Sequence, residues 1–245
     1  MNRVSQKEFR KPVATGFGIL ALLLGLAGGV TRAHADEAPY PAMAPADQYL
    51  IPDQAAEIAQ ARAAAPPSIG NAASVMVLTL KGYETVATGT NGFVCMVQRA
   101  WFSGLDDSEF WNPKTRAPIC FNPQAVRSIL PAFLERTQWA LSGASRAEIT
   151  ERTKAEIAAN TFPVPEIGTL TYMMAKDAYH SDRVHGPWHP HLMFFLPRIR
   201  DADWGANLPG SPVMGGSDDI EPYTIFFVPL ATWSDGSPDT HPMHM

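Results

Sequence analysis

Residues 74–101 read SVMVLTLKGYETVATGTNGFVCMVQRAW, and this stretch decides the fold. Three runs rich in Val, Thr, Tyr and Phe are separated by turn sequences at residues 81–82 and 89–92. β-Branched and aromatic residues favour strands, and Asn-Gly between two such runs is a strong hairpin signal. The stretch therefore predicts a three-stranded meander with Cys95 on its third strand.

The segment before these strands, residues 36–67, is rich in proline and alanine. It predicts an extended leader that ends in a short helix. Asp53 is a suitable N-cap for this helix, which is expected to run to about residue 64. Its apolar face is mostly alanine, so we expect it to contribute little to a hydrophobic core.

Two further helices are expected after the meander. Asn122 followed by Pro123 is typical of a helix start. That helix would run to about residue 141 with a kink near Pro131, because proline removes a backbone hydrogen bond. Ser145 and Glu148 have the spacing of a capping box, which predicts a helix to about residue 159.

The rest of residues 68–245 has strand character. Apolar runs predict strands at residues 168–175, 191–196 and 223–230. Strands, then helices, then strands predict a single α+β domain with a mainly antiparallel sheet and two or three helices.

The first 35 residues have the pattern of a secretory signal peptide. A basic stretch leads into an uncharged apolar run at residues 17–30, and Ala33-x-Ala35 follows as a cleavage site. An apolar run of 14 residues is shorter than the ~20 that span a bilayer. We therefore expect a periplasmic or secreted protein without stable membrane insertion after signal cleavage; a retained anchor is the alternative.

The mature chain is expected to be acidic. Residues 1–35 hold five of the 19 Lys and Arg residues and one of the 24 Asp and Glu residues, so the net charge falls to −9 when they are removed. Such a chain repels the phosphate backbone. Nucleic acid is therefore excluded as an expected partner.

The chain has only two cysteines, Cys95 and Cys120. An isolated pair in an oxidising compartment usually forms a disulfide. A redox or metal role is the alternative, but the Cys-x-x-Cys spacing typical of those sites is absent. Two free buried thiols are a further alternative.

Histidines form the one cluster with chemical potential. Four of them fall within twelve residues, and two more lie at the C-terminus, at His241 and His244. The segment 179–191 also holds Tyr179 and Asp182, so acid–base, cationic and stacking groups occur together. The residues expected to bind a ligand are His180, Arg183, His185, Trp188, His189 and His191.

His189 and His191 are the candidate metal ligands. Side chains two residues apart in a strand share a face, so the two rings could supply half of a tetrahedral zinc or copper site. Met173, Met174 and Met193 add soft ligands suited to copper(I). Against a metal, no carboxylate follows the His-Pro-His segment closely. Histidines hydrogen-bonded at a sheet edge and methionines that fill the core are the structural alternatives.

Two segments resemble a known family. Residues 90–95, TNGFVC, and residues 186–195, GPWHPHLMFF, are similar to segments of an uncharacterised family of secreted bacterial proteins. The resemblance extends over roughly residues 53–230. It implies export and a single fold, and it names no activity.

Three functions remain open from the sequence. The first is a module that binds a metal or a small polar or aromatic ligand at the segment 179–191. The second is a small hydrolase or isomerase with a histidine base. The third is a structural envelope protein with no chemistry.

Overall fold

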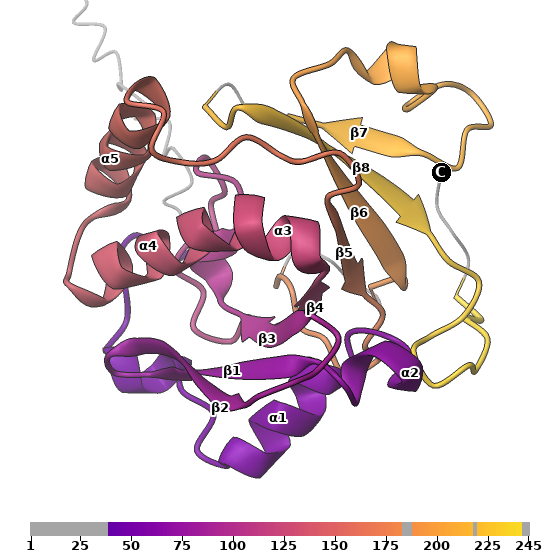
Figure 1. Ribbon diagram of the computed structural model, residues 1–245. Helices are drawn as coiled ribbons and strands as arrows, with labels where there is room; N and C mark the ends of the chain where they lie inside the picture. Colours follow the sequence, from indigo (N-terminus) through magenta and orange to yellow (C-terminus); the bar gives the residue numbers. More distant parts are fainter. Residues whose placement is uncertain (1–38, 183–187, 218–219, 242–245) are drawn as a thin grey trace, which may run out of the picture. The chain divides into compact units, whose positions relative to one another are not determined.

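The computed structural model describes residues 39–182, 188–217 and 220–241; the predicted signal peptide lies outside them. Its described strands form one sheet in the order β2-β1-β3-β4-β5-β6-β8-β7 (Figure 1). The strands are β1 (Ser74–Thr79), β2 (Gly82–Ala87), β3 (Val94–Gln98), β4 (Ala117–Phe121), β5 (Leu170–Met173), β6 (His191–Pro197), β7 (Met214–Gly216) and β8 (Tyr223–Pro229).

Five α-helices accompany the sheet in the described part of the chain. They are α1 (Gln54–Arg62), α2 (Pro67–Gly70), α3 (Pro123–Ser128), α4 (Leu130–Leu141) and α5 (Arg146–Ala158). Short 3-10 segments occur at Ala46–Tyr49, Ala100–Phe102 and Asp201–Trp204. The capping residues expected from the sequence start three of the α-helices: Asp53 caps α1, Asn122 caps α3, and Ser145 with Glu148 forms the capping box of α5.

The predicted meander is wrong at its third strand. β1 and β2 form the expected antiparallel hairpin, but β3 pairs with β1 in parallel. The loop before β3 crosses back over the start of β1, where the N–H of Thr90 donates to the carbonyl of Ala72 at 2.8 Å. A Cβ on Gly89 would lie 2.3 Å from backbone atoms of residues 72–74. The glycine therefore permits the crossing, instead of marking a hairpin turn.

The predicted architecture is wrong in two further respects. The parallel pair makes the sheet mixed, whereas a mainly antiparallel sheet was expected. The chain also has more than two or three helices, partly because the helix expected over residues 122–141 is divided. Ile129 separates α3 from α4, and Pro131 lies in the first turn of α4, where its missing N–H costs no hydrogen bond.

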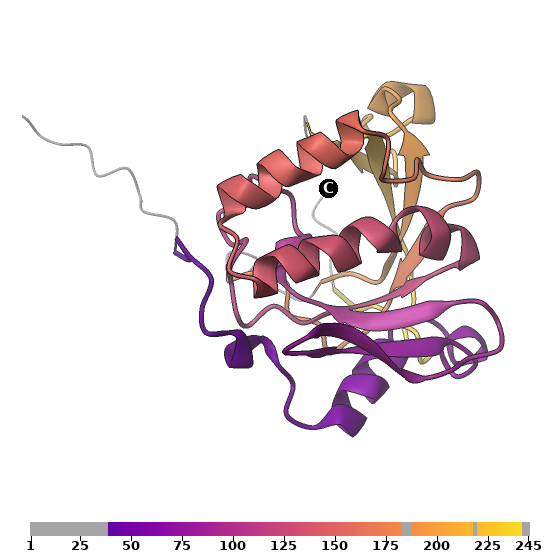
Figure 2. The same ribbon diagram turned by 60° about the vertical axis from the view of Figure 1, so that its left-hand side comes forward.

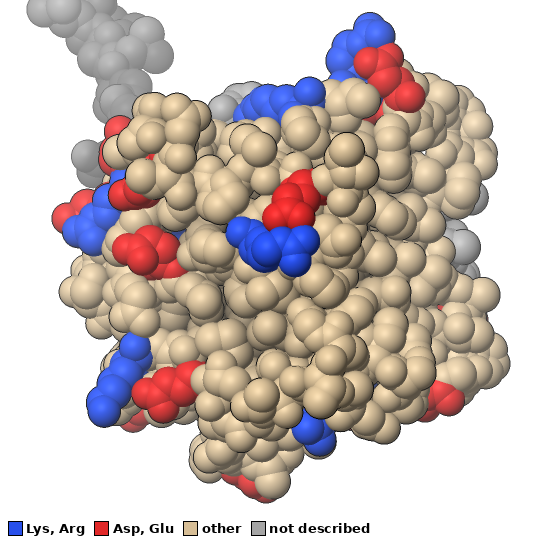
Figure 3. Space-filling model, in the orientation of Figure 1, with Lys and Arg blue, Asp and Glu red and all other residues tan. Residues whose placement is uncertain are grey.

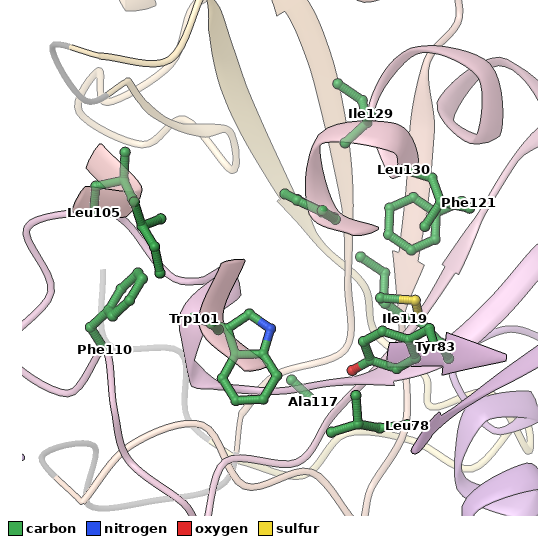
Figure 4. Close-up of a cluster of buried hydrophobic side chains, with 14 of the residues drawn as sticks. Leu78, Tyr83, Trp101, Leu105, Phe110, Ala117, Ile119, Phe121, Ile129 and Leu130 are labelled. Atoms are coloured by element: carbon green, nitrogen blue, oxygen red, sulfur yellow. The ribbon is translucent and has the colours of Figure 1, made fainter. Parts of the chain in front are cut away.

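The two faces of the strands pack against different helices. Figure 2 shows α4 on one side of β1 and β3 and α1 on the other. Successive residues of a strand point to opposite faces, and Val75 and Val77 accordingly pack with alanines of α1 and of the turn that follows it. Leu78 and Met96 face the other way, into the larger core. Figure 4 shows Leu78 in this core beside Tyr83. That core is rich in aromatic side chains, including Trp101, Phe110, Phe121 and Phe133.

The predicted disulfide is confirmed. Cys95 and Cys120 lie directly opposite each other on the antiparallel strands β3 and β4, and they are bonded. Both side chains are buried in the smaller core beside α1. The disulfide thus fixes the pairing of β3 with β4, a strand that the sequence pattern did not indicate.

A buried ion pair holds α1 to the sheet. Glu57 accepts hydrogen bonds from Arg99 Nη2 at 2.8 Å and from the N–H of Leu78 at 3.3 Å. Arg99 also donates to the carbonyls of Tyr49 and Val97. Both charged side chains are buried, so α1 contributes to the core despite its alanine-rich sequence.

Charged groups on the face shown in Figure 3 lie in small, separate groups of both signs. Exposed ion pairs such as Arg127–Glu166 and Arg200–Asp203 hold opposite charges together on the surface. No helix in the described ranges combines the length and the apolar character needed to cross a membrane.

Candidate functional site

The histidine segment meets the C-terminal segment at one end of the sheet. His191 opens β6 and pairs with Pro229 at the end of β8. The N–H of Leu230 then donates to the carbonyl of Pro190 at 2.7 Å. Beyond this point the chain turns back, and the N–H of Asp239 donates to the carbonyl of Ala231 at 2.8 Å. This return places residues 239–241 beside the start of β6.

Asp239 binds two histidine side chains at once. Its Oδ2 lies 2.5 Å from Nδ1 of His189, and its Oδ1 lies 2.7 Å from Nδ1 of His241. The carboxylate is 5% exposed, whereas the two imidazoles are 29% and 42% exposed. Burial alone would raise the pKa of Asp239, but the hydrogen bonds from His189 and His241 hold that pKa below its ordinary value. Asp239 is therefore a carboxylate at neutral pH.

This carboxylate fixes the tautomer of both rings. An ionised aspartate can only accept hydrogen bonds, so Nδ1 of His189 and Nδ1 of His241 must each carry a proton. In the neutral imidazole the other nitrogen, Nε2, then has a free lone pair. The ring centroids lie 6.4 Å apart. The end of the sheet where β6 begins and β8 ends thus presents two half-exposed imidazoles with basic Nε2 atoms.

Trp188 organises the other two described histidines. His180 stacks on its indole, with ring centroids 4.1 Å apart and ring planes at 18°. Nε1 of Trp188 lies 2.7 Å from Nδ1 of His191. The carbonyl oxygen of His189 lies 2.8 Å from the same Nδ1 of His191. The indole only donates and the carbonyl only accepts, so this Nδ1 satisfies one neighbour at a time.

His180 and His191 are held neutral by their surroundings. Burial lowers the pKa of His180 to about 3, with a smaller effect from the charge of His191. Burial likewise lowers the pKa of His191 to about 4. Within the described ranges, Nε2 of each ring is buried and has no hydrogen-bond partner. These two histidines pack around Trp188 and offer no accessible base.

Acid should therefore destabilise the fold through His180. The unfolded histidine has a pKa of about 6.5, and the folded one about 3, so the unfolded chain binds the extra proton between these values. The free energy of unfolding should fall as the pH drops, by up to about 1.4 kcal/mol per pH unit for this group. His180→Phe keeps a stacked ring without titrating, and should flatten the slope in urea unfolding between roughly pH 6 and 4. A slope equal to that of the wild type would contradict this assignment.

The predicted site residues divide into separate groups. Asp182 accepts from Tyr179, from Tyr40 and, at 3.0 Å, from Lys114. The hydrogen bonds from Tyr40 and Lys114 lower the pKa of Asp182, which makes this an ionised surface network. Arg183, His185 and His244 lie outside the described residues.

The two candidate metal ligands, His189 and His191, have different partners. His189 bonds Asp239, whereas His191 contacts Trp188 and the ring of Phe227. No three His, Cys, Asp or Glu side chains of the described residues are arranged as ligands of one metal. The methionines considered for copper, Met173, Met174 and Met193, are buried.

Sequence reasoning missed the role of Asp239. It lies 50 residues from His189, and no local spacing connects the two. The only signal is its position two residues before His241, which allows a carboxylate to bond a following imidazole.

Comparisons with protein-family models, with curated proteins and with solved structures give no match. The resemblance to secreted bacterial proteins therefore stays a prediction. The functional argument depends on the geometry alone.

Proposed function

We propose that this protein is an exported binding module that holds a zinc or copper ion on Nε2 of His189 and Nε2 of His241. The observation that carries the proposal is the buried carboxylate of Asp239, which bonds Nδ1 of both rings. Histidines that ligate metals usually donate their other ring N–H to a carboxylate or carbonyl, which orients the ring and raises its basicity.

Both rings can reach one ion only if one of the two hydrogen bonds to Asp239 is given up. Metal–nitrogen bonds of about 2 Å to a tetrahedral ion place two ring centroids roughly 5 Å apart. The present separation is 6.4 Å, so the more exposed ring, His241, must turn toward His189 and give up its hydrogen bond to Asp239, while Asp239 continues to orient His189. Water or another side chain would complete the coordination, since the two rings supply half of a tetrahedral site.

Export is part of the proposal. The signal-peptide pattern of residues 1–35 supports it. The bonded pair Cys95–Cys120 adds support, because disulfides persist in oxidising compartments such as the periplasm and the extracellular space. In either compartment the protein would acquire its metal after crossing the membrane.

The test is a metal titration of untagged protein. Calorimetry with Zn²⁺ and Cu²⁺, with elemental analysis of the purified protein, should give one ion per chain. His189→Ala or His241→Ala should weaken binding at least 100-fold, and Asp239→Asn about 10- to 100-fold. His180→Phe serves as the control, since it removes a histidine outside the pair and should leave binding unchanged. Equal affinity in the wild type and the His189→Ala/His241→Ala variant would refute the proposal.

A second candidate function follows from the same contact. A carboxylate that orients a histidine through Nδ1 is also the arrangement of a general base, with Nε2 taking the proton. A hydrolase or isomerase of this kind would work without metal. Hydrolysis of p-nitrophenyl esters that persists in EDTA and disappears in His189→Ala would favour this enzyme over the metal module.

A further inference from the structure

A groove lies along α1, on the side away from the sheet. Its volume is about 540 Å³, within the range of small-molecule sites. It is formed by one side of α1, by α2, and by the C-terminal segment around residue 235. The residues that line it are Ala55, Ile58, Ala59, Arg62, Ala63, Ala65, Pro67, Asn71, Ser234 and Asp235.

The spacing of α1 explains this lining. Residues three and four apart share one side of a helix, and positions 55, 58, 59, 62 and 63 have that spacing. Glu57 and Ala61 lie on the other side and are buried against the sheet. Small alanine side chains leave the groove open and apolar. The surface over α1, at the bottom of Figure 3, is accordingly largely uncharged.

Arg62 is the one basic residue in this lining. Its Nε is buried and has no hydrogen-bond partner, and within the described ranges its side chain forms no ion pair. The two buried arginines, by contrast, are paired: Arg99 with Glu57 and Arg136 with Glu221. Arg62 is half-buried, so its terminal guanidinium nitrogens face the groove with no anion of the described residues paired to them, and they can pair with the anion of a ligand.

The one acidic residue in the lining is already engaged. Asp235 bonds Lys176 Nζ at 2.7 Å and the hydroxyl of Ser237 at 2.6 Å. The hydrogen bond from Lys176, followed by those from Ser237, lowers the pKa of Asp235. This carboxylate is therefore ionised and paired with Lys176 at the rim. Its charge would still repel a doubly charged phosphate more than a singly charged carboxylate.

We propose that this groove binds a small monocarboxylate with an apolar body. The carboxylate pairs with the guanidinium of Arg62, whose planar fork matches a carboxylate in two parallel hydrogen bonds. The apolar body lies over Ile58, Ala59 and Pro67. This site shares no residue with the Asp239 histidine pair, so it is independent of the metal proposal.

The test compares hexanoate with hexanamide, which has the same body without the charge. Titrations followed by amide NMR shifts should show hexanoate binding at least tenfold more tightly, with the shifts concentrated at residues 58–71. Arg62→Gln should abolish this preference. Ala59→Phe, at an exposed position, should block both probes by filling the groove.

Arg127→Gln is the matched control. It removes an arginine from a surface ion pair with Glu166, outside the groove, and should bind hexanoate as the wild type does. Equal binding of hexanoate and hexanamide by the wild type would overturn the proposal. Unchanged hexanoate affinity in Arg62→Gln would also overturn it.

Discussion

Replacing Glu57 with alanine should lower the free energy of unfolding by about 3–5 kcal/mol. The change leaves Arg99 buried without its counter-charge, in a side chain that is 0% exposed. It also removes the acceptor of the Leu78 N–H. Because Glu57 connects α1 to β1 and to Arg99, the residue directly after β3, we expect α1 and the smaller core to loosen together. Urea unfolding at neutral pH measures the effect.

The matched control is Glu151→Ala. Glu151 pairs with Lys154 at 2.8 Å, but on the exposed side of α5, where ion pairs are worth less than about 1 kcal/mol. Its loss should hardly move the unfolding midpoint. If Glu57→Ala cost no more than this control, the ion pair would not be what holds α1 in place.

Removing the disulfide should cost about 3 kcal/mol. The bond closes a loop with a sequence separation of 25 residues, and in the chain-entropy model it restricts the unfolded chain by that amount. The variant Cys95→Ala/Cys120→Ala avoids free thiols and leaves the apolar surroundings intact. Its unfolding by urea should have a lower midpoint than that of the oxidised wild type.

Wild-type protein unfolded in reducing buffer is the comparison. Reduction and double substitution should destabilise to a similar extent, since both open the same loop. A double variant as stable as the oxidised wild type would show that strand pairing alone fixes β3 against β4.

Local sequence signals predicted the helix starts and the β1–β2 hairpin because they depend on neighbouring residues. Asp53, Asn122 and Ser145 each cap a helix through their own side chains. The course of the chain after β2 depends instead on the close passage of Gly89 over the start of β1. That contact has no local signature, because a Gly-Thr-Asn-Gly sequence is typical of hairpins too. β4 was missed for a related reason: residues 117–121 are apolar throughout, without the alternation of a half-buried strand.

The site was predictable in part. The segment of residues 179–191 was expected to form the site. Of its described residues, Trp188, His189 and His191 have ring and hydrogen-bond contacts, whereas residues 183–187 lie outside the described ranges. Alternation along a strand predicted a shared role for His189 and His191. In the structure the C-terminal segment returns to this end of the sheet. Asp239 therefore bonds the ring of His189, whereas Trp188 bonds the ring of His191. Long-range contacts of this kind cannot be read from spacing in one sequence.

The most direct measurement of the central claim is a long-range ¹H–¹⁵N NMR spectrum of the imidazole rings, recorded at about pH 7.5, because it reports which nitrogen of each histidine carries the proton. We expect His189 and His241 to carry it on Nδ1. Addition of Zn²⁺ should then shift Nε2 of these two rings and leave His180 unchanged. Protons on Nε2 of His189 and His241, or zinc shifts confined to other histidines, would contradict the account.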